Sequence, residues 1–176
     1  MAFHFDGYSQ EHYGKTLNMG VGVAGYSGYY RYAGKTIPVF NINYEIDVVK
    51  NLTLAPFASI YAFKDDYYWG NNNNPDRYYT YSEVVVPIGI KSYYYFDDLI
   101  NATSDWDIYA GASLGFAIVN STWDTGYQGN KNHFNKGSQV FLDVHVGATY
   151  HFNKRMGAYL DLSSGVSTIG LQFNGK

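Results

Sequence analysis

The stretch from Val39 to Val48 constrains the fold of this chain more than any other. It reads VFNINYEIDV, and successive side chains of a β-strand point to opposite faces. One face of such a strand is apolar, with Phe40, Ile42, Tyr44, Ile46 and Val48, and the other is polar, with Asn41, Asn43, Glu45 and Asp47. The same alternation recurs from Gln139 to Phe152. Long two-faced strands in succession predict a closed barrel whose apolar face meets lipid and whose polar face fills the interior.

The composition agrees with a membrane location. Charged residues make up 15% of the chain, against roughly 25% in ordinary soluble proteins. The 20 Tyr suit membrane–water interfaces, because a tyrosine ring is apolar and its hydroxyl needs water. No segment reaches the roughly 18 consecutive apolar residues of a membrane-spanning helix. Met1 reads as an added start on a mature chain from which an export signal has been removed.

Charge and cysteine content exclude other classes. The net charge of −3 gives no reason to expect nucleic-acid binding. The chain has no cysteine, so it has neither disulfides nor a thiolate metal site. No metal-ligand spacing is evident, and no cofactor is predicted.

Eight strands and their connections predict an up-and-down antiparallel barrel. Tight turns are expected at Lys50-Asn51 and Asn153-Lys154, and long polar connections at Lys64–Arg77 and Asn120–Gly137. Outer-membrane barrels have short periplasmic turns and long outer loops, so the termini are predicted to be periplasmic and the long loops extracellular. The expected strands are Lys15–Tyr30, Thr36–Val49, Leu52–Phe63, Tyr78–Phe96, Asp105–Val119, Gln139–Phe152, Arg155–Leu162 and Val166–Phe173. The predicted domains are a periplasmic N-terminal tail (1–14), the transmembrane barrel (15–173) and a short C-terminal segment (174–176).

Small residues indicate which face lies inside. Glycine weakens a water-facing strand, whereas a narrow eight-stranded lumen needs small residues beside large ones. Many small residues fall on the polar face: Gly20, Gly22, Ala24, Gly89, Gly111, Ser113, Gly115, Ala117 and Gly147. The polar face is therefore predicted to lie inside. Because lipid satisfies no backbone polar group, the eighth strand must pair with the first.

Two stretches carry a family resemblance. They are Trp106–Gly111, which reads WDIYAG, and Gly147–Tyr159, which begins GATYHFN. In this arrangement the chain resembles small bacterial outer-membrane β-barrels, the family of outer-membrane protein X and its relatives in Bacteroidetes, over Lys15 to Phe173. The resemblance implies contact with outer-membrane lipid and lipopolysaccharide and insertion by the barrel assembly machinery. It also implies that Phe173, an aromatic residue at the end of the last strand, is the assembly signal.

Nine titratable side chains on the polar strand faces form a candidate interior network: Glu45, Asp47, Glu83, Lys91, Asp107, Asp143, His145, His151 and Asp161. Buried charges are costly unless they are paired, so Lys91 is expected to pair with Glu83 or Glu45. The favoured interpretation is a solid polar plug, because eight strands leave an interior only wide enough for side chains. The alternative is a proton or ion path.

An enzymatic role has a weaker basis. Asp143, His145 and Asp161 on adjacent strands would imitate part of a catalytic triad, with Ser163 or Ser164 as the candidate nucleophile. Some eight-stranded barrels are lipid A deacylases or palmitoyltransferases. The deacylase pattern places Ser two residues after His, and the palmitoyltransferase pattern pairs His with an Asp-Ser step. Neither pattern occurs in this chain, so no catalytic residue is assigned.

The aromatic residues Tyr67, Tyr68, Trp69 and Trp123 in the long polar segments are candidate partner contacts. The simpler interpretation places them in the outer interface belt. The first functional hypothesis is a non-enzymatic outer-membrane barrel, either structural or presenting its loops for adhesion or for docking to a larger outer-membrane complex. The alternatives are a narrow channel for ions or water, and a lipid A-modifying enzyme.

Overall fold

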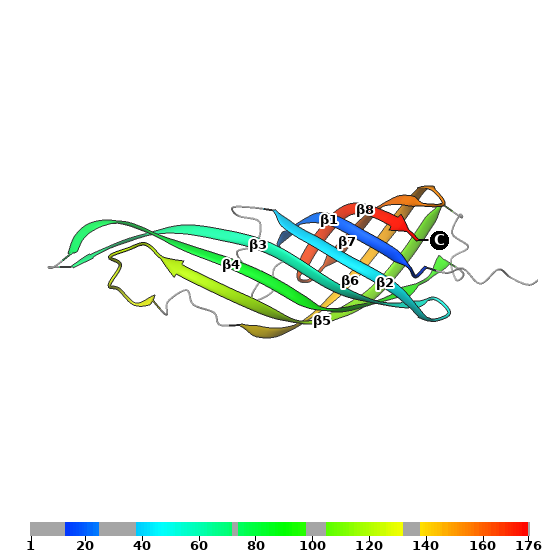
Figure 1. Ribbon diagram of the computed structural model, residues 1–176, viewed down its shortest axis with the longest axis horizontal. Helices are drawn as coiled ribbons and strands as arrows, with labels where there is room; N and C mark the ends of the chain where they lie inside the picture. Colours follow the sequence, from blue (N-terminus) through cyan, green and yellow to red (C-terminus); the bar gives the residue numbers. More distant parts are fainter. Residues whose placement is uncertain (1–12, 25–37, 72–73, 98–104, 132–137, 176) are drawn as a thin grey trace, which may run out of the picture.

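A computed structural model describes residues 13–24, 38–71, 74–97, 105–131 and 138–175. They form a closed antiparallel barrel in which each strand pairs with its neighbour in sequence and β8 pairs with β1 (Figure 1). The strands are β1 (Thr16–Ala24), β2 (Val39–Val49), β3 (Leu52–Asn71), β4 (Asn74–Tyr95), β5 (Trp106–Trp123), β6 (Gln139–Asn153), β7 (Met156–Ser163) and β8 (Val166–Asn174). The predicted eight-stranded barrel and its closure are confirmed. None of these described residues belongs to a helix that could cross a membrane.

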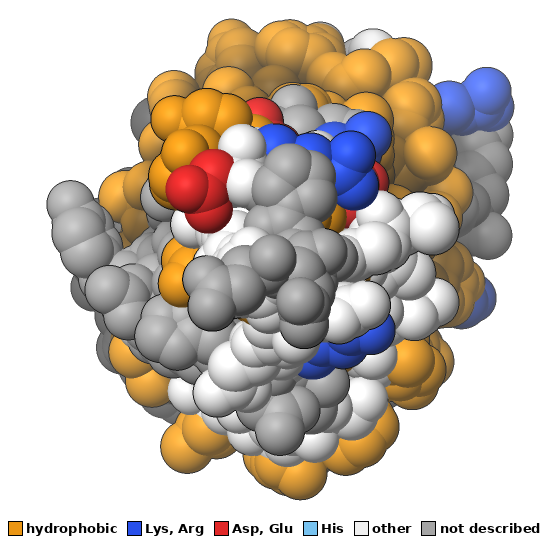
Figure 2. All heavy atoms as spheres, turned by 90° about the vertical axis from the view of Figure 1, so that its left-hand side faces the viewer, with side chains coloured by type: hydrophobic (Ala, Val, Ile, Leu, Met, Phe, Trp, Pro, Cys, Tyr) orange, Lys and Arg blue, Asp and Glu red, His pale blue; other side chains and the backbone are white. Residues whose placement is uncertain are grey.

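The polar strand faces lie inside the barrel. On β2, Asn43 and Glu45 are 3% and 2% exposed, whereas Phe40 and Ile42 are 51% and 42% exposed. A barrel dissolved in water would bury the opposite set. Seen from the end where the longest strands project, hydrophobic side chains line much of the outer rim (Figure 2). The inverted arrangement suits an apolar solvent around the barrel.

Glycines admit large side chains to the narrow lumen. A Cβ added at Gly20 would lie 2.3 Å from the Tyr159 hydroxyl oxygen, and one added at Gly115 would lie 2.3 Å from the ring of Phe141. Both separations are shorter than any normal contact. These strand positions therefore require glycine because bulky residues from other strands occupy the space.

The outward face of β5 gives the height of the apolar belt. From Trp106 to Ile118 this face carries no charged residue, and Asn120 and Thr122 follow. At ~3.3 Å per residue and a tilt of ~40°, the twelve-residue separation corresponds to roughly 30 Å across the membrane. Trp106 packs against Tyr150 of β6 at the tight-turn end, with ring centroids 5.0 Å apart. This height matches the hydrocarbon core of a bilayer.

Three strands continue well beyond the belt. β3 has 20 residues and β4 has 22, although a membrane strand needs only about 9–11. Their ladder runs on to Asn71 opposite Asn74, and β5 follows β4 as far as Trp123 opposite Tyr81. We call residues 63–71, 74–83 and 121–123 the extension; it projects to the left in Figure 1.

The extension corrects two boundaries. The prediction of a polar loop at Lys64–Arg77 is wrong, since nearly all of that segment is β-strand. The second long connection begins at Asp124 instead of Asn120. The polar residues on the outward face of the extension resemble a loop in sequence. Aromatic side chains on the inward face hold its strands together. The predicted end of the first strand at Tyr30 and start of the second at Thr36 fall outside the described residues.

Candidate functional site

Glu45 is the centre of the interior network. Its carboxylate, 2% exposed, accepts hydrogen bonds from Asn18 Nδ2 at 2.6 Å, Thr53 Oγ1 at 2.9 Å and the Tyr95 hydroxyl at 2.6 Å. These donors come from β1, β3 and β4. Bonds to a charged acceptor are the stronger kind, so Glu45 fixes three strands to a single side chain.

Lys91 and Asp161 form the second interior centre. Lys91 Nζ lies 3.3 Å from Asp161 Oδ2, and their side chains are 9% and 1% exposed. The lysine also lies 5.6 Å from the centroid of the Phe57 ring, within cation–π range. The prediction that Lys91 pairs with Glu83 or Glu45 is wrong. Glu83 is eight residues away on the same strand, roughly 26 Å along it, and β7 brings Asp161 across the lumen instead.

A third pair lies near the mouth of the barrel at the tight-turn end. His151 Nε2 is 2.6 Å from Asp107 Oδ2, and both side chains are partly buried. They line an open polar cavity of about 440 Å³ together with Tyr13 and Lys154. Among the residues that the structure describes, no three His, Asp or Glu side chains are placed to hold a metal ion.

Of the remaining members of the predicted set, Glu83 and Asp47 lie apart from these centres, whereas Asp143 lines the same small cavity as Lys91. The carboxylate of Glu83 accepts a hydrogen bond from the Tyr81 hydroxyl near the base of the extension. Asp143 Oδ1 accepts from Ser164 Oγ at 3.5 Å. Asp47 is exposed, and its Oδ1 accepts from the backbone N–H of Gly14 at 2.7 Å. The predicted set therefore lies at several levels of the lumen, with Asp143 and His145 at the level of the Lys91–Asp161 pair.

The lumen has little free space at the level of Lys91. A cavity of about 20 Å³ lies there, lined among others by Asp143 and Ser113. That volume is about enough for one water molecule. The alternation of large and small side chains fills the remainder, as expected for eight strands.

The triad-like residues meet only in part. His145 Nδ1 lies 3.6 Å from Asp161 Oδ2, longer than a hydrogen bond. Ser163 Oγ accepts from the backbone N–H of Gly165 at 3.0 Å, and Ser164 Oγ from that of Val144 at 3.1 Å. Within the described part of the chain, both ring nitrogens of His145 lack a hydrogen-bond partner. A nucleophile held beside the histidine, which triad chemistry requires, is not part of this geometry.

The extension has an aromatic core of its own. Tyr127, 4% exposed, stacks on Trp123 with centroids 4.0 Å apart and planes 8° from parallel. Trp69 and Tyr79 contact it edge-on at 5.2 and 5.4 Å. Desolvation, and secondly the nearby Tyr67, raises the pKa of the Tyr127 phenol. Pairs of this kind contribute about 0.5–1.5 kcal/mol each beyond area burial.

A turn brings Tyr127 back onto the strands. The Tyr127 N–H donates to the Asp124 carbonyl at 3.2 Å, and Gly126 has φ +92°, a conformation that favours glycine. Asp124 is fixed to Thr80 by two bonds of 3.0 Å. The sequence pattern assigns Tyr127 no role. Phe63, Tyr67 and Trp69, which share one strand face with Asp65, are the available signal for a strand.

The predicted contact residues divide between two faces of the extension. Tyr67, Trp69 and Trp123 are partly buried in the aromatic core, whereas Tyr68 is 57% exposed and faces outward. Tyr68 pairs across the strands with Tyr78, 68% exposed, with centroids 5.2 Å apart. Tyr68 lies eight residues beyond Ile60 of the belt, roughly 26 Å along the strand. That distance removes it from the interface belt.

Comparison with solved structures identifies the class of fold. No family model matches the sequence, and no curated protein matches it either. The crystal structure of Neisserial surface protein A is similar, with a TM-score of 0.50 and 16% identity over 91% of this chain and 95% of that chain. The chain has the fold of a small outer-membrane β-barrel. The crystal structure of Ail, the attachment invasion locus protein of Yersinia pestis, gives a TM-score of 0.44 and 10% identity over 90% of this chain and 94% of that one.

The predicted class of small outer-membrane barrels is thereby confirmed at the level of the fold. The narrower likeness to outer-membrane protein X stays a prediction. An architecture of this kind serves many activities, so function has to be argued from the side chains.

Proposed function

We propose that this chain is a non-enzymatic protein of the bacterial outer membrane that presents the extension outside the cell as a docking element. Its relatives would be the barrels related to outer-membrane protein X. The apolar belt of roughly bilayer height supports the membrane location. The tight turns at the opposite end from the extension support periplasmic termini.

The extension is the basis of the proposal because a packed aromatic core joins its three strands. A loop that only connects two strands needs no core, yet here Tyr127 closes an aromatic cluster over three strands. Rigid elements reduce the entropy lost on binding. An exposed aromatic pair, Tyr68 and Tyr78, stands on its outward face.

The direction of that pair favours one kind of partner. Outward side chains of a barrel strand point away from the barrel axis, parallel to the membrane. Tyr68 and Tyr78 therefore face neighbouring molecules of the same membrane, so we favour docking to another outer-membrane complex over adhesion to a distant surface. Buried tyrosines are frequent energetic centres of protein interfaces.

The two other functions have less support. A conducting channel needs a continuous path, and the cavity beside Lys91 is about 20 Å³. A lipid A-modifying enzyme needs an activated nucleophile. The Ser163 hydroxyl bonds a backbone N–H, and the Ser164 hydroxyl bonds a backbone N–H and the Asp143 carboxylate, so neither bonds His145.

The test is purification from native outer membrane in mild detergent, with mass spectrometry of what accompanies the barrel. We expect a stoichiometric partner with the wild type. The double variant Tyr68→Ser/Tyr78→Ser should weaken the complex about 30-fold or more, equivalent to the ~2 kcal/mol of an interface hot spot. Asp76→Asn, which alters an exposed residue of the same hairpin, is the control. A wild-type barrel that purifies alone would exclude docking.

A further inference from the structure

A groove crosses the lipid-facing wall of the barrel. It has a volume of about 570 Å³ and runs over β1, β2 and β3 to the edge of β4, strands that lie side by side in Figure 1. Its apolar walls are the side chains of Met19, Val21, Phe40, Ile42, Ile60 and Val86. No charged residue lines it.

Ala58 explains why the wall is hollow at this place. In the ladder, Ala58 stands between Ile42 of β2 and Ile88 of β4. Its methyl group ends well below the tips of these branched neighbours, and Ile60 and Phe40 rise beside it with 48% and 51% exposure. One small residue among large ones leaves a slot that a slender apolar chain would fill.

The depth of the groove indicates which part of a lipid it meets. Along the outward face of β3 the order is Ala58, Ile60, Ala62, Lys64, and Lys64 is the first charge on that face. Four residues from Ile60 to Lys64 correspond to roughly 10 Å of height at a tilt of ~40°. The groove therefore lies among acyl chains, just below headgroup level on the side of the extension.

We propose that this groove holds one acyl chain of a lipid A molecule of the outer leaflet. The proposal rests on the orientation given under Proposed function, in which the extension faces outward. Free lipid tails are as apolar as the groove, so retention comes from van der Waals contact on several sides of the chain. The phosphates of lipid A would stand at the level of the Lys64 ammonium group, which a zwitterionic headgroup matches less well.

The test is native mass spectrometry of the barrel extracted from outer membranes that contain both lipopolysaccharide and phospholipid. We expect one lipid A-bearing molecule on the wild type, and at least a fivefold lower occupancy on Ala58→Phe, whose ring fills the slot. The control is Ala148→Phe on β6, at the opposite wall. Both variants must migrate as folded barrels before heating. A milder second variant, Ala58→Leu, should reduce occupancy to an intermediate level.

Three outcomes would overturn the inference: equal lipid A retention by all variants, retention of phospholipid in its place, or no retained lipid on the wild type. Equal retention by all variants, or no retained lipid, leaves the docking function untouched, because Ala58 is remote from Tyr68 and Tyr78. Retained phospholipid would also contradict the outward orientation of the extension on which both proposals rest. If both proposals hold, the Tyr68/Tyr78 variant should lose its protein partner and keep wild-type lipid A occupancy.

Discussion

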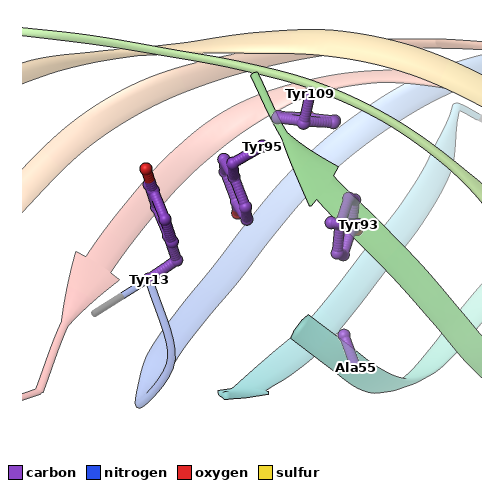
Figure 3. Close-up of a cluster of buried hydrophobic side chains, with 5 residues drawn as sticks. All are labelled: Tyr13, Ala55, Tyr93, Tyr95 and Tyr109. Atoms are coloured by element: carbon purple, nitrogen blue, oxygen red, sulfur yellow. The ribbon is translucent and has the colours of Figure 1, made fainter. Parts of the chain in front are cut away.

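Tyr13 stacks face to face on Tyr95, with ring centroids 3.8 Å apart and planes 4° from parallel. Tyr13 precedes β1, yet its side chain enters the mouth of the barrel at the tight-turn end and is 7% exposed (Figure 3). The bend that directs it inward includes Lys15 at φ +60°, whose N–H donates to the Glu45 carbonyl at 2.8 Å. Tyr95 in turn donates to the Glu45 carboxylate. The chain thus closes its own lumen with a residue from outside the strands.

Replacing Tyr13 tests this closure. Tyr13→Ala should lower the free energy of unfolding by about 2–4 kcal/mol, since it removes both the stacked pair and a buried ring. Urea unfolding in lipid vesicles measures the change. Tyr68→Ala, which removes an exposed ring of the extension, is the control and should change stability by less than about 1 kcal/mol. Equal effects of the two variants would show that the stack contributes nothing.

Gly14 offers an independent test of the same closure. A Cβ at this position would lie 2.3 Å from the backbone nitrogen of Asp47. Gly14→Ala should therefore displace the chain from the mouth and expose the Tyr13 ring to solvent, which chemical modification of tyrosine in the folded barrel would detect. Gly175→Ala, whose added Cβ would lie 2.8 Å from the Lys15 carbonyl oxygen, should have a smaller effect because this contact is longer than the one at Gly14.

The Lys91–Asp161 pair should be coupled strongly. Lys91→Met leaves the Asp161 carboxylate buried without its cation, a change that destabilises proteins by about 3–5 kcal/mol. The double variant Lys91→Met/Asp161→Asn should recover at least half of that loss, because no uncompensated charge remains. Unfolding measurements on the four proteins of the cycle give the coupling energy. Additive losses would mean that the two side chains do not interact.

Replacing Glu45 should lower the free energy of unfolding more than replacing Asp47, although the two carboxylates lie close together on one strand. Glu45→Ala removes the acceptor of three buried hydrogen bonds, at about 1–3 kcal/mol each and not additively, although Asn18 Nδ2 keeps its bond to Asn43 Oδ1. Glu45→Gln keeps one acceptor oxygen and should have an intermediate effect. Asp47→Ala is expected to lose about 1 kcal/mol or less, since Asp47 is exposed. Heat or urea unfolding would rank the three variants.

The extension should lose order without loss of the barrel. Tyr127→Ser removes the residue that contacts Trp69, Tyr79 and Trp123. Amide hydrogen exchange in residues 63–71 and 74–83 should accelerate at least tenfold, while exchange within the membrane belt stays unchanged. An extension that keeps wild-type protection would show that strand pairing alone maintains it. Gln128→Ser, an exposed neighbour, is the control.

Several features could be predicted because they are local. The period of two at Val39–Val48 belongs to a single strand, so it identified the inward and outward faces before any tertiary contact was known. The tight turn at Lys50-Asn51 was also predictable, and Asn51 adopts φ +61° there, a conformation that asparagine tolerates well. At Lys64–Arg77 the local signal misled, because the charged run Lys64-Asp65-Asp66 interrupts the aromatic alternation.

The number of strands, their antiparallel order and the face that lies inside can be predicted from the amino-acid sequence, since each follows from alternation and turn chemistry within short segments. The contact of Lys91 with Asp161, the packing of Tyr127 on the extension and the entry of Tyr13 into the mouth arise only in the folded barrel. Each of these contacts joins residues far apart in the chain. Their meeting depends on how the closed barrel staggers its strands, and no local pattern encodes that stagger.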